Sequence, residues 1–239
     1  MKNQYFGDRN DMFKYDLALT LVTEVAPLVR FTFVPMLTPD DGRSDGNLTD
    51  YPTLGSHRPH LHRFLMECVA NPSRRKVASL REYMRTYEPG VAYCPYMDEE
   101  FLAAANRNAY FGSIAPEALR ASVIFVDPDN GFEVPSTRRG NAEKYLRYSE
   151  LANLYRAMDD TSVLLAYQHW AYVKRTEAFA TVTERTESAL PEGLPPVCIS
   201  SGSIGIFAFA KTDKLLVEVR KSLDDYALRT GFRVYSAQG

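Results

Sequence analysis

Short uninterrupted apolar runs alternate along the chain with longer segments in which apolar residues recur every three or four positions. The clearest run is 121–126, A-S-V-I-F-V, which ends at Asp127-Pro128. An apolar run of this length is typical of a strand buried on both faces of a parallel sheet. Pro128 has no backbone N–H to donate to a sheet, and Asn130-Gly131 is a turn dipeptide, so we expect the strand to end here.

The same patterns predict the remaining elements. We expect buried strands at 31–36 and 161–167, short strands at 77–80 and 91–94, a hairpin at 197–200 and 204–210, and a terminal strand at 232–235. We expect helices at 11–29, 60–70, 98–105, 145–158, 172–189 and 213–229. Strands that alternate with helices imply right-handed crossovers and a mostly parallel sheet. We therefore predict one α/β domain over 1–239, with a doubly wound, Rossmann-like sheet and an antiparallel carboxyl-terminal hairpin. The strands that end at Met36, Val126 and Ala166 should be parallel and central.

Composition adds limits on location and partners. The chain has 239 residues, 45% of them hydrophobic and 24% charged, with a formal net charge of -2. This charge leaves no global basic footprint, so nucleic-acid binding would require a local patch. No apolar stretch approaches the ~18 residues of a membrane span, and the first residues lack the apolar core of a signal peptide. The cysteines match neither a zinc spacing nor a disulfide framework, so we expect a cytoplasmic protein; they are Cys68, Cys94 and Cys198.

Polar side chains gather where the predicted strands end. Asp127 follows the strand at 121–126, and His169 follows the next buried strand. Open α/β sheets bind their ligands at the carboxyl ends of the strands. We therefore predict that Lys14, Asp40, Asp127 and His169 converge on one cleft. The segment 37–59 has no periodicity, and a loop of that length in a compact domain is usually functional or mobile.

Four blocks of sequence carry a resemblance to known families. They are G-D-x-x-D-x-x-K-Y at 7–15, L-T-P-D-D-x-R-x-D-G at 37–46, D-P-D-N-G at 127–131 and Y-Q-H at 167–169. Together they resemble a widespread uncharacterised bacterial group. The first block is also similar to the opening of the ribosomal RNA adenine amino-methyltransferases that act on the large subunit. Lys14 falls at that family's lysine and Tyr15 at the histidine after it, and D-P-D-N looks like the family's D-P-P-Y motif.

The resemblance implies a class I methyltransferase that uses S-adenosylmethionine, with nucleic acid as a candidate substrate. It places Asp127, Lys14 and His169 in catalysis, and it places the cofactor against Tyr15, Thr38, Asp40, Gly42 and Asn130. The sequence departs from the family in two places. T-P-D-D-G replaces the glycine-rich turn after the first strand, and Asp129 and Asn130 replace the second proline and the tyrosine of D-P-P-Y. Of the nearby residues, only Phe132 could then stack on a base.

The acidic residues support a second interpretation. Asp40, Asp41 and Asp45 would face Asp127 and Asp129 across the cleft, and carboxylate oxygens are the preferred ligands of magnesium. A metal held by Asp40, Asp41, Asp127 and Asp129 could activate water for phosphoester hydrolysis. His169 would then act as a general acid or base, and Lys14 would contact a phosphate. A third interpretation is a degenerate, non-catalytic binding module.

A local basic patch is the feature that would favour a nucleic-acid partner. Clustered arginines and lysines attract phosphates electrostatically. The residues of this patch are Arg58, Arg63, Arg74, Arg75, Lys76, Arg138 and Arg139. The sequence predicts no membrane partner and leaves the oligomeric state open.

Overall fold

The computed structural model describes residues 1–239 apart from 43–45, 56, 100–106, 138–140, 171–173 and 238–239. Its helices are α1 (Arg9–Glu24), α2 (Pro52–Gly55), α3 (Pro59–Ala70), α4 (Leu80–Tyr87), α5 (Arg107–Gly112), α6 (Tyr148–Ala157), α7 (Arg175–Ala189) and α8 (Asp213–Thr230). The main strands are β1 (Arg30–Pro35), β2 (Ala92–Pro95), β3 (Ser122–Asp127), β6 (Val163–His169), β7 (Val197–Ser200), β8 (Ile204–Ala210) and β9 (Arg233–Ser236). Two short strands, β4 (Gly131–Phe132) and β5 (Tyr145–Leu146), pair separately.

Seven strands form one mixed sheet in the order β2-β1-β3-β6-β8-β7-β9. The strands β2, β1, β3 and β6 are parallel to one another, with Val34 opposite Val126 and Val126 opposite Ala166. β8 pairs antiparallel with both β6 and β7, and β9 pairs antiparallel with β7. The prediction of an α/β fold with a mostly parallel central sheet is thus confirmed. The outer edge is formed by β9, so the antiparallel pair β7 and β8 lies inside the sheet.

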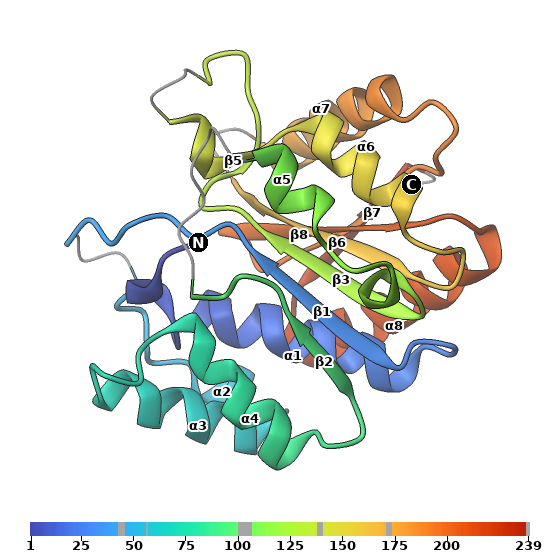
Figure 1. The fold of residues 1–239 in the computed structure, drawn as a ribbon. Helices are drawn as coiled ribbons and strands as arrows, with labels where there is room; N and C mark the ends of the chain where they lie inside the picture. The colour runs from blue at the N-terminus through green and yellow to red at the C-terminus, as the bar shows by residue number, and fades with distance from the viewer. Residues whose placement is uncertain (43–45, 56, 100–106, 138–140, 171–173, 238–239) are drawn as a thin grey trace.

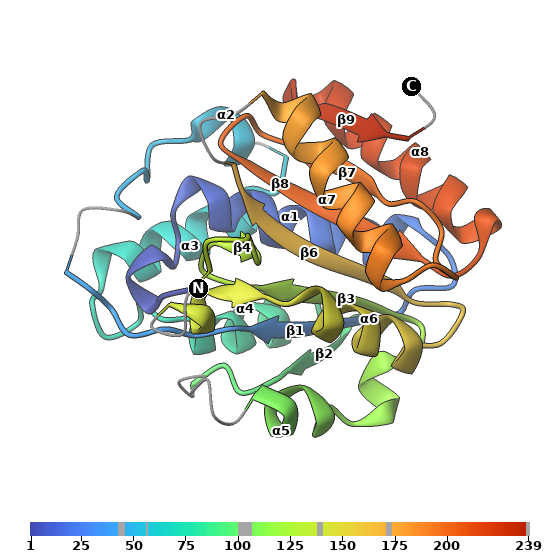
Figure 2. The same cartoon turned by 90° about the horizontal axis from the view of Figure 1, so that it is seen from above.

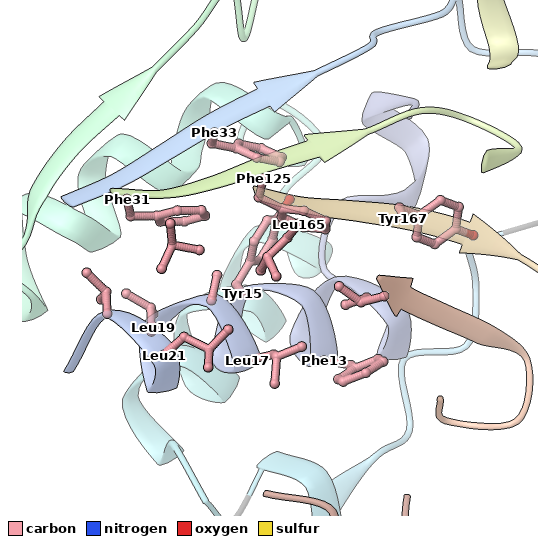
Figure 3. Packing of buried hydrophobic residues seen from close by; sticks show 14 of the residues in the cluster. Phe13, Tyr15, Leu17, Leu19, Leu21, Phe31, Phe33, Phe125, Leu165 and Tyr167 are labelled. Atoms are coloured by element: carbon pink, nitrogen blue, oxygen red, sulfur yellow. The ribbon is translucent and has the colours of Figure 1, made fainter. Parts of the chain in front are cut away.

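Helices cover both faces of this sheet (Figures 1 and 2). Along β3, Val123 and Phe125 join the core under α1, α3, α4 and α8, while Ile124 and Val126 join the core under α5, α6 and α7. This alternation is what the two-residue period of a strand requires when both faces are buried. Figure 3 shows α1 packed against the strands, with Tyr15 of α1 beneath the phenylalanines of β1 and β3. Each fully buried large apolar side chain contributes roughly 1.5–3 kcal/mol to folding.

The ends of the helices follow from local chemistry. Asp8 caps α1, and its side chain accepts a hydrogen bond from the Asp11 N–H at 2.8 Å. The helix ends at Glu24, five residues before the predicted end at 29, because the residue before Pro27 is disfavoured in helical geometry. Gly231 ends α8 in the left-handed conformation, with φ 74°.

Several other predicted elements need correction. The predicted strand at 77–80 is wrong: Val77–Ser79 is a 3-10 turn, and Leu80 begins α4. The helix expected at 145–158 begins later, at Tyr148, because β5 precedes it. The helix expected at 172–189 is α7, which begins at Arg175; residues 171–173 lie outside the described residues, as does most of the helix expected at 98–105. Among the helices that the structure describes, none is long and apolar enough to cross a membrane.

Candidate functional site

The ammonium group of Lys14 lies buried between two carboxylates. Lys14, in α1, donates to Asp127 Oδ2 at 3.0 Å and to Asp11 Oδ1 at 3.1 Å. Asp127 ends β3, and the exposed fraction is 4% for Lys14 and 0% for both acids. Charges buried this deeply are tolerated only when they are paired and hydrogen-bonded. The contact therefore fixes the first turns of α1 to the carboxyl end of β3.

Aromatic groups complete the surroundings of this ammonium. It lies 4.5 Å from the centroid of the Tyr167 ring, in β6, which is a cation–π distance. On the far side, Asp11 Oδ2 accepts a hydrogen bond from the Tyr15 hydroxyl at 3.4 Å. Asp127 Oδ1 is buried and has no hydrogen-bond partner among the described residues. An unpaired buried acceptor costs ~1–3 kcal/mol. The hydrogen bonding of the cluster is therefore incomplete at this oxygen.

Burial and pairing act in opposite directions on the titration of this cluster. Burial alone lowers the pKa of Lys14, but Asp127 and Asp11 outweigh it and hold that pKa well above its usual value. Burial raises the pKa of Asp11 to about 7, although Lys14 opposes the rise. Burial likewise raises the pKa of Asp8 against the effect of Lys14. Near neutral pH, Lys14 is therefore charged and Asp11 is balanced between its two forms.

The loop after β1 binds residues 1–4. The N–H of Thr38 donates to the backbone carbonyl of the first residue at 2.8 Å. The backbone N–H of Gln4 donates to Asp40 Oδ1 at 3.1 Å, and the Gly42 N–H donates to the Gln4 side-chain oxygen at 3.3 Å. Three residues predicted to hold a cofactor thus contact the chain's own amino-terminal segment.

Lys2 joins two of the acids that were predicted to bind a metal. Its ammonium lies 2.9 Å from Asp41 Oδ2 and 3.2 Å from Asp129 Oδ2. Burial would raise the pKa of Asp129, but the amino group of Met1 and the ammonium of Lys2 outweigh it and lower that pKa. The two acids therefore do meet, as predicted, but with an ammonium between them.

A cavity of about 610 Å³ opens beside this cluster, at the carboxyl ends of β3 and β6. It contains both signs of charge, amide groups and hydroxyl groups. Its polar side chains are Tyr5, Asp8, Asn10, Lys14, Asn47, Asp129, Asn130, Tyr167, His169 and Ser203. The volume lies in the range of ~300–1,000 Å³ that is typical of small-molecule sites.

Of the four residues predicted to converge on one cleft, two line the cavity. Lys14 and His169 line the cavity, and Asp127 lies behind Lys14 as its buried partner. Asp40 is exposed and is not among the residues that line the cavity. Asp45 lies outside the described residues.

Two aromatic residues differ from their predicted roles. Tyr15 is fully buried in the core, and its hydroxyl reaches Asp11 and not the cavity. Phe132 is also buried and stacks on Tyr148, with ring centroids 5.2 Å apart, so it is not free to stack on a substrate base.

Several residues of the site had no predicted role, and three of them stand out. Asp8, Asp11 and Tyr167 stand inside the four sequence blocks, but we assigned them no role. A signal for the first two existed: an aspartate before an amphipathic helix is a typical N-cap, and Asp11 precedes Lys14 by three residues, which places both on one helix face.

Part of the predicted basic patch is engaged within the protein. Arg58 pairs with Asp16 at 2.9 Å and with Glu88 at 2.7 Å, and Arg75 donates to the backbone carbonyl of Gly46 at 2.6 Å. Arg74 pairs with the side chains of Glu67 and Glu82. Arg63 and Lys76 are exposed, while Arg138 and Arg139 lie outside the described residues.

Gly131 is required by the tight contact between the D-P-D-N-G and Y-Q-H blocks. Its φ is 108°, and a Cβ placed there would lie 2.5 Å from Gln168 Oε1. Gly131→Ala should therefore destabilise the protein by at least about 2 kcal/mol, through backbone strain and overpacking together. Gly202 is a matched control because its φ is 95° but a Cβ added there would meet no described atom within 4 Å. Gly202→Ala should cost about 1 kcal/mol in a urea titration. Equal losses for the two variants would show that the contact with Gln168 is unimportant.

Comparison with known proteins adds no relative. Protein-family models, curated proteins and solved structures were searched, and none of the three comparisons finds a match. Within the described part of the chain, no group of three or more histidine, cysteine, aspartate or glutamate side chains is arranged to hold a metal ion.

Proposed function

We propose that this chain is an S-adenosylmethionine-dependent, methyltransferase-like enzyme whose cofactor binds in the cavity beside Lys14. The observation that carries the proposal is the 3.0 Å contact between Lys14 and Asp127, which are 113 residues apart in sequence. These residues represent the two blocks through which the sequence resembles the amino-methyltransferases. Their contact, beside a cavity at the carboxyl ends of parallel strands, is the arrangement that a shared binding site would need.

The charges around the cavity fit this cofactor. S-adenosylmethionine carries a sulfonium, an ammonium and a carboxylate, so a site for it needs groups of both signs. Asp8 would face its positive part, and Lys14, while paired with Asp127 and Asp11, would attract its carboxylate. Asn130 and Ser203 offer partners for ribose hydroxyls. When bound, the cofactor would supply an activated methyl group.

The residues have different roles in this proposal. Asp127 is fully buried, so its role is to hold Lys14 and not to touch an acceptor. His169 is exposed beside the cavity and would accept the proton that an acceptor amine loses. Thr38, Asp40 and Gly42 bind residues 1–4, and we assign them no contact with the cofactor.

The charged surface gives little information about the methyl acceptor. Of the predicted phosphate-binding patch, Arg63 and Lys76 are the exposed members in the part of the chain that the structure describes. Two cations give little support for a nucleic-acid acceptor, since phosphate binding usually uses many. The proposal therefore covers the cofactor and leaves the acceptor open.

The magnesium-dependent hydrolase has weaker support. Asp127 is paired with Lys14, and Asp41 and Asp129 are both paired with Lys2. A cation would have to displace these ammonium groups before it could bind the carboxylates. Asp40 is exposed and bonded to the Gln4 backbone, apart from the cavity.

Calorimetric titration with three ligands tests the proposal. We expect S-adenosylmethionine to bind and to raise the melting temperature, because a ligand at 100 times its Kd stabilises the native state by ~2.7 kcal/mol. S-adenosylhomocysteine should bind more weakly, because it lacks the sulfonium charge that the acidic side chains favour. Magnesium chloride should produce no shift.

A charge-only variant sharpens this test. Asp8→Asn removes one carboxylate from the cavity but keeps the helix cap, since asparagine and aspartate are equally good N-caps. At pH 8 it should reduce the preference for S-adenosylmethionine over S-adenosylhomocysteine, while Asp160→Asn, an exposed control, should not. If neither nucleoside nor magnesium binds the wild type, both enzymatic interpretations fail and the binding module is left.

A further inference from the structure

We infer that Gln168 is a positioning residue, which holds Asn130 and His169 in place at the cavity. Gln168 does not itself line the cavity, whereas its two neighbours in space do. Its effect on the ligand would therefore pass through them. The inference rests on the proposed function only for the identity of that ligand.

The amide of Gln168 joins two segments that are far apart in sequence. Its Oε1 accepts a hydrogen bond from the Phe132 N–H at 2.8 Å, and its Nε2 donates to the His169 carbonyl at 2.6 Å. The His169 N–H in turn donates to the Asn130 carbonyl at 3.2 Å. Two of these bonds connect residues 130–132 to the end of β6, and the bond to the His169 carbonyl orients the Gln168 amide within β6.

Only an amide of this length satisfies both partners. A backbone N–H can only donate and a backbone carbonyl can only accept, so the two ends of the Gln168 side chain are not interchangeable here. Glutamate would keep the acceptor for Phe132 but lose the donor for His169. Methionine would fill the same space and lose both.

The turn at Gly131 packs tightly against Gln168. A Cβ on Gly131 would lie 2.5 Å from Gln168 Oε1 and 2.9 Å from Gln168 Cα. The turn therefore closes directly onto the backbone and side chain of Gln168. Side-chain placement at a binding site depends on such supporting contacts, since small displacements of a site residue weaken binding.

Ligand affinity in three variants tests this role. Gln168→Met should weaken binding of S-adenosylmethionine about tenfold, and Gln168→Glu about threefold, because one hydrogen bond is retained in the second. In an Asn130→Ala background the effect of Gln168→Met should shrink, because its influence passes partly through Asn130. A purely structural residue would show the same loss in both backgrounds. Tyr155→Phe is a control, because it removes a buried hydrogen bond to the Ala210 carbonyl away from the cavity.

A second measurement needs no ligand. In hydrogen exchange, the amides of Phe132 and His169 should be protected in the wild type and should exchange faster in Gln168→Met. The amides of the β6 core, 163–166, should keep their protection in the same variant.

The two measurements separate the possible failures. If the wild type binds no S-adenosylmethionine, the proposed function fails, and hydrogen exchange alone decides the role of Gln168. Unchanged exchange at Phe132 and His169 in Gln168→Met would overturn the inference. Wild-type affinity in that variant would also overturn it.

Discussion

Replacing Lys14 with methionine should destabilise the protein by about 3–5 kcal/mol, the loss typical of a buried ion pair with one partner removed. Lys14 is 4% exposed, and it is the ammonium partner of both Asp127 and Asp11. Methionine nearly matches the side-chain volume, so the loss would come from charge and not from a cavity. Both carboxylates would remain buried without a counter-charge. Urea unfolding at pH 8 measures the effect.

Two further variants make this prediction specific. Lys174→Met removes a lysine that is 82% exposed, and a surface ion pair of that kind contributes at most ~1 kcal/mol. In an Asp127→Asn background, Lys14→Met should cost less than in the wild type, because one of the two carboxylates has already lost its charge. A loss below about 1 kcal/mol for Lys14→Met would mean that the ion pair is not buried as the structure has it.

The central sheet was predictable because its strands carry the strongest pattern in the sequence. Continuous apolar runs such as 121–126 fit a strand with both faces buried, and the structure places β3 between two parallel neighbours. The error at 77–80 arises because a short, mostly apolar segment can belong to a strand or to a buried helix end. A wider window shows the correct pattern: Leu80, Tyr83, Met84 and Tyr87 follow helical spacing, and they lie in α4.

The candidate site was predictable only where it touches the ends of these strands. Asp127 and His169 stand at such ends, and a shared sheet edge brings them to one side of the molecule. Asp40 lies in a segment with no periodicity, whose path is set by contacts with residues 1–4. Such contacts depend on tertiary packing, which local sequence patterns do not encode. For the same reason, the sequence predicted that Asp127 and Lys14 share one cleft but not that they form a buried ion pair.

Changing Asp11 to asparagine should alter how the stability of the protein depends on pH. Burial raises the pKa of Asp11 to about 7 in the folded state, from an ordinary value of 3.8. A group whose pKa is raised on folding contributes stability that is fully present below about pH 4 and is lost as the pH rises through about 7. The wild type should therefore lose this stability between pH 4 and pH 8. The variant has no carboxyl group at position 11, so this pH dependence should be absent from it.

The wild type should thus lose about 4 kcal/mol of unfolding free energy relative to Asp11→Asn between pH 4 and pH 8. This figure converts the pKa shift at ~1.4 kcal/mol per pKa unit. Urea titrations from pH 3 to pH 8 measure this difference directly. Asp129→Asn supplies a contrast of opposite sign, since Met1 and Lys2 lower the pKa of Asp129 on folding. Its carboxylate stabilises the folded state above about pH 4, so this variant should fall further behind the wild type as the pH rises from 3. A difference for Asp11→Asn that stays constant from pH 4 to pH 8 would show that Lys14 outweighs burial and keeps Asp11 ionised throughout.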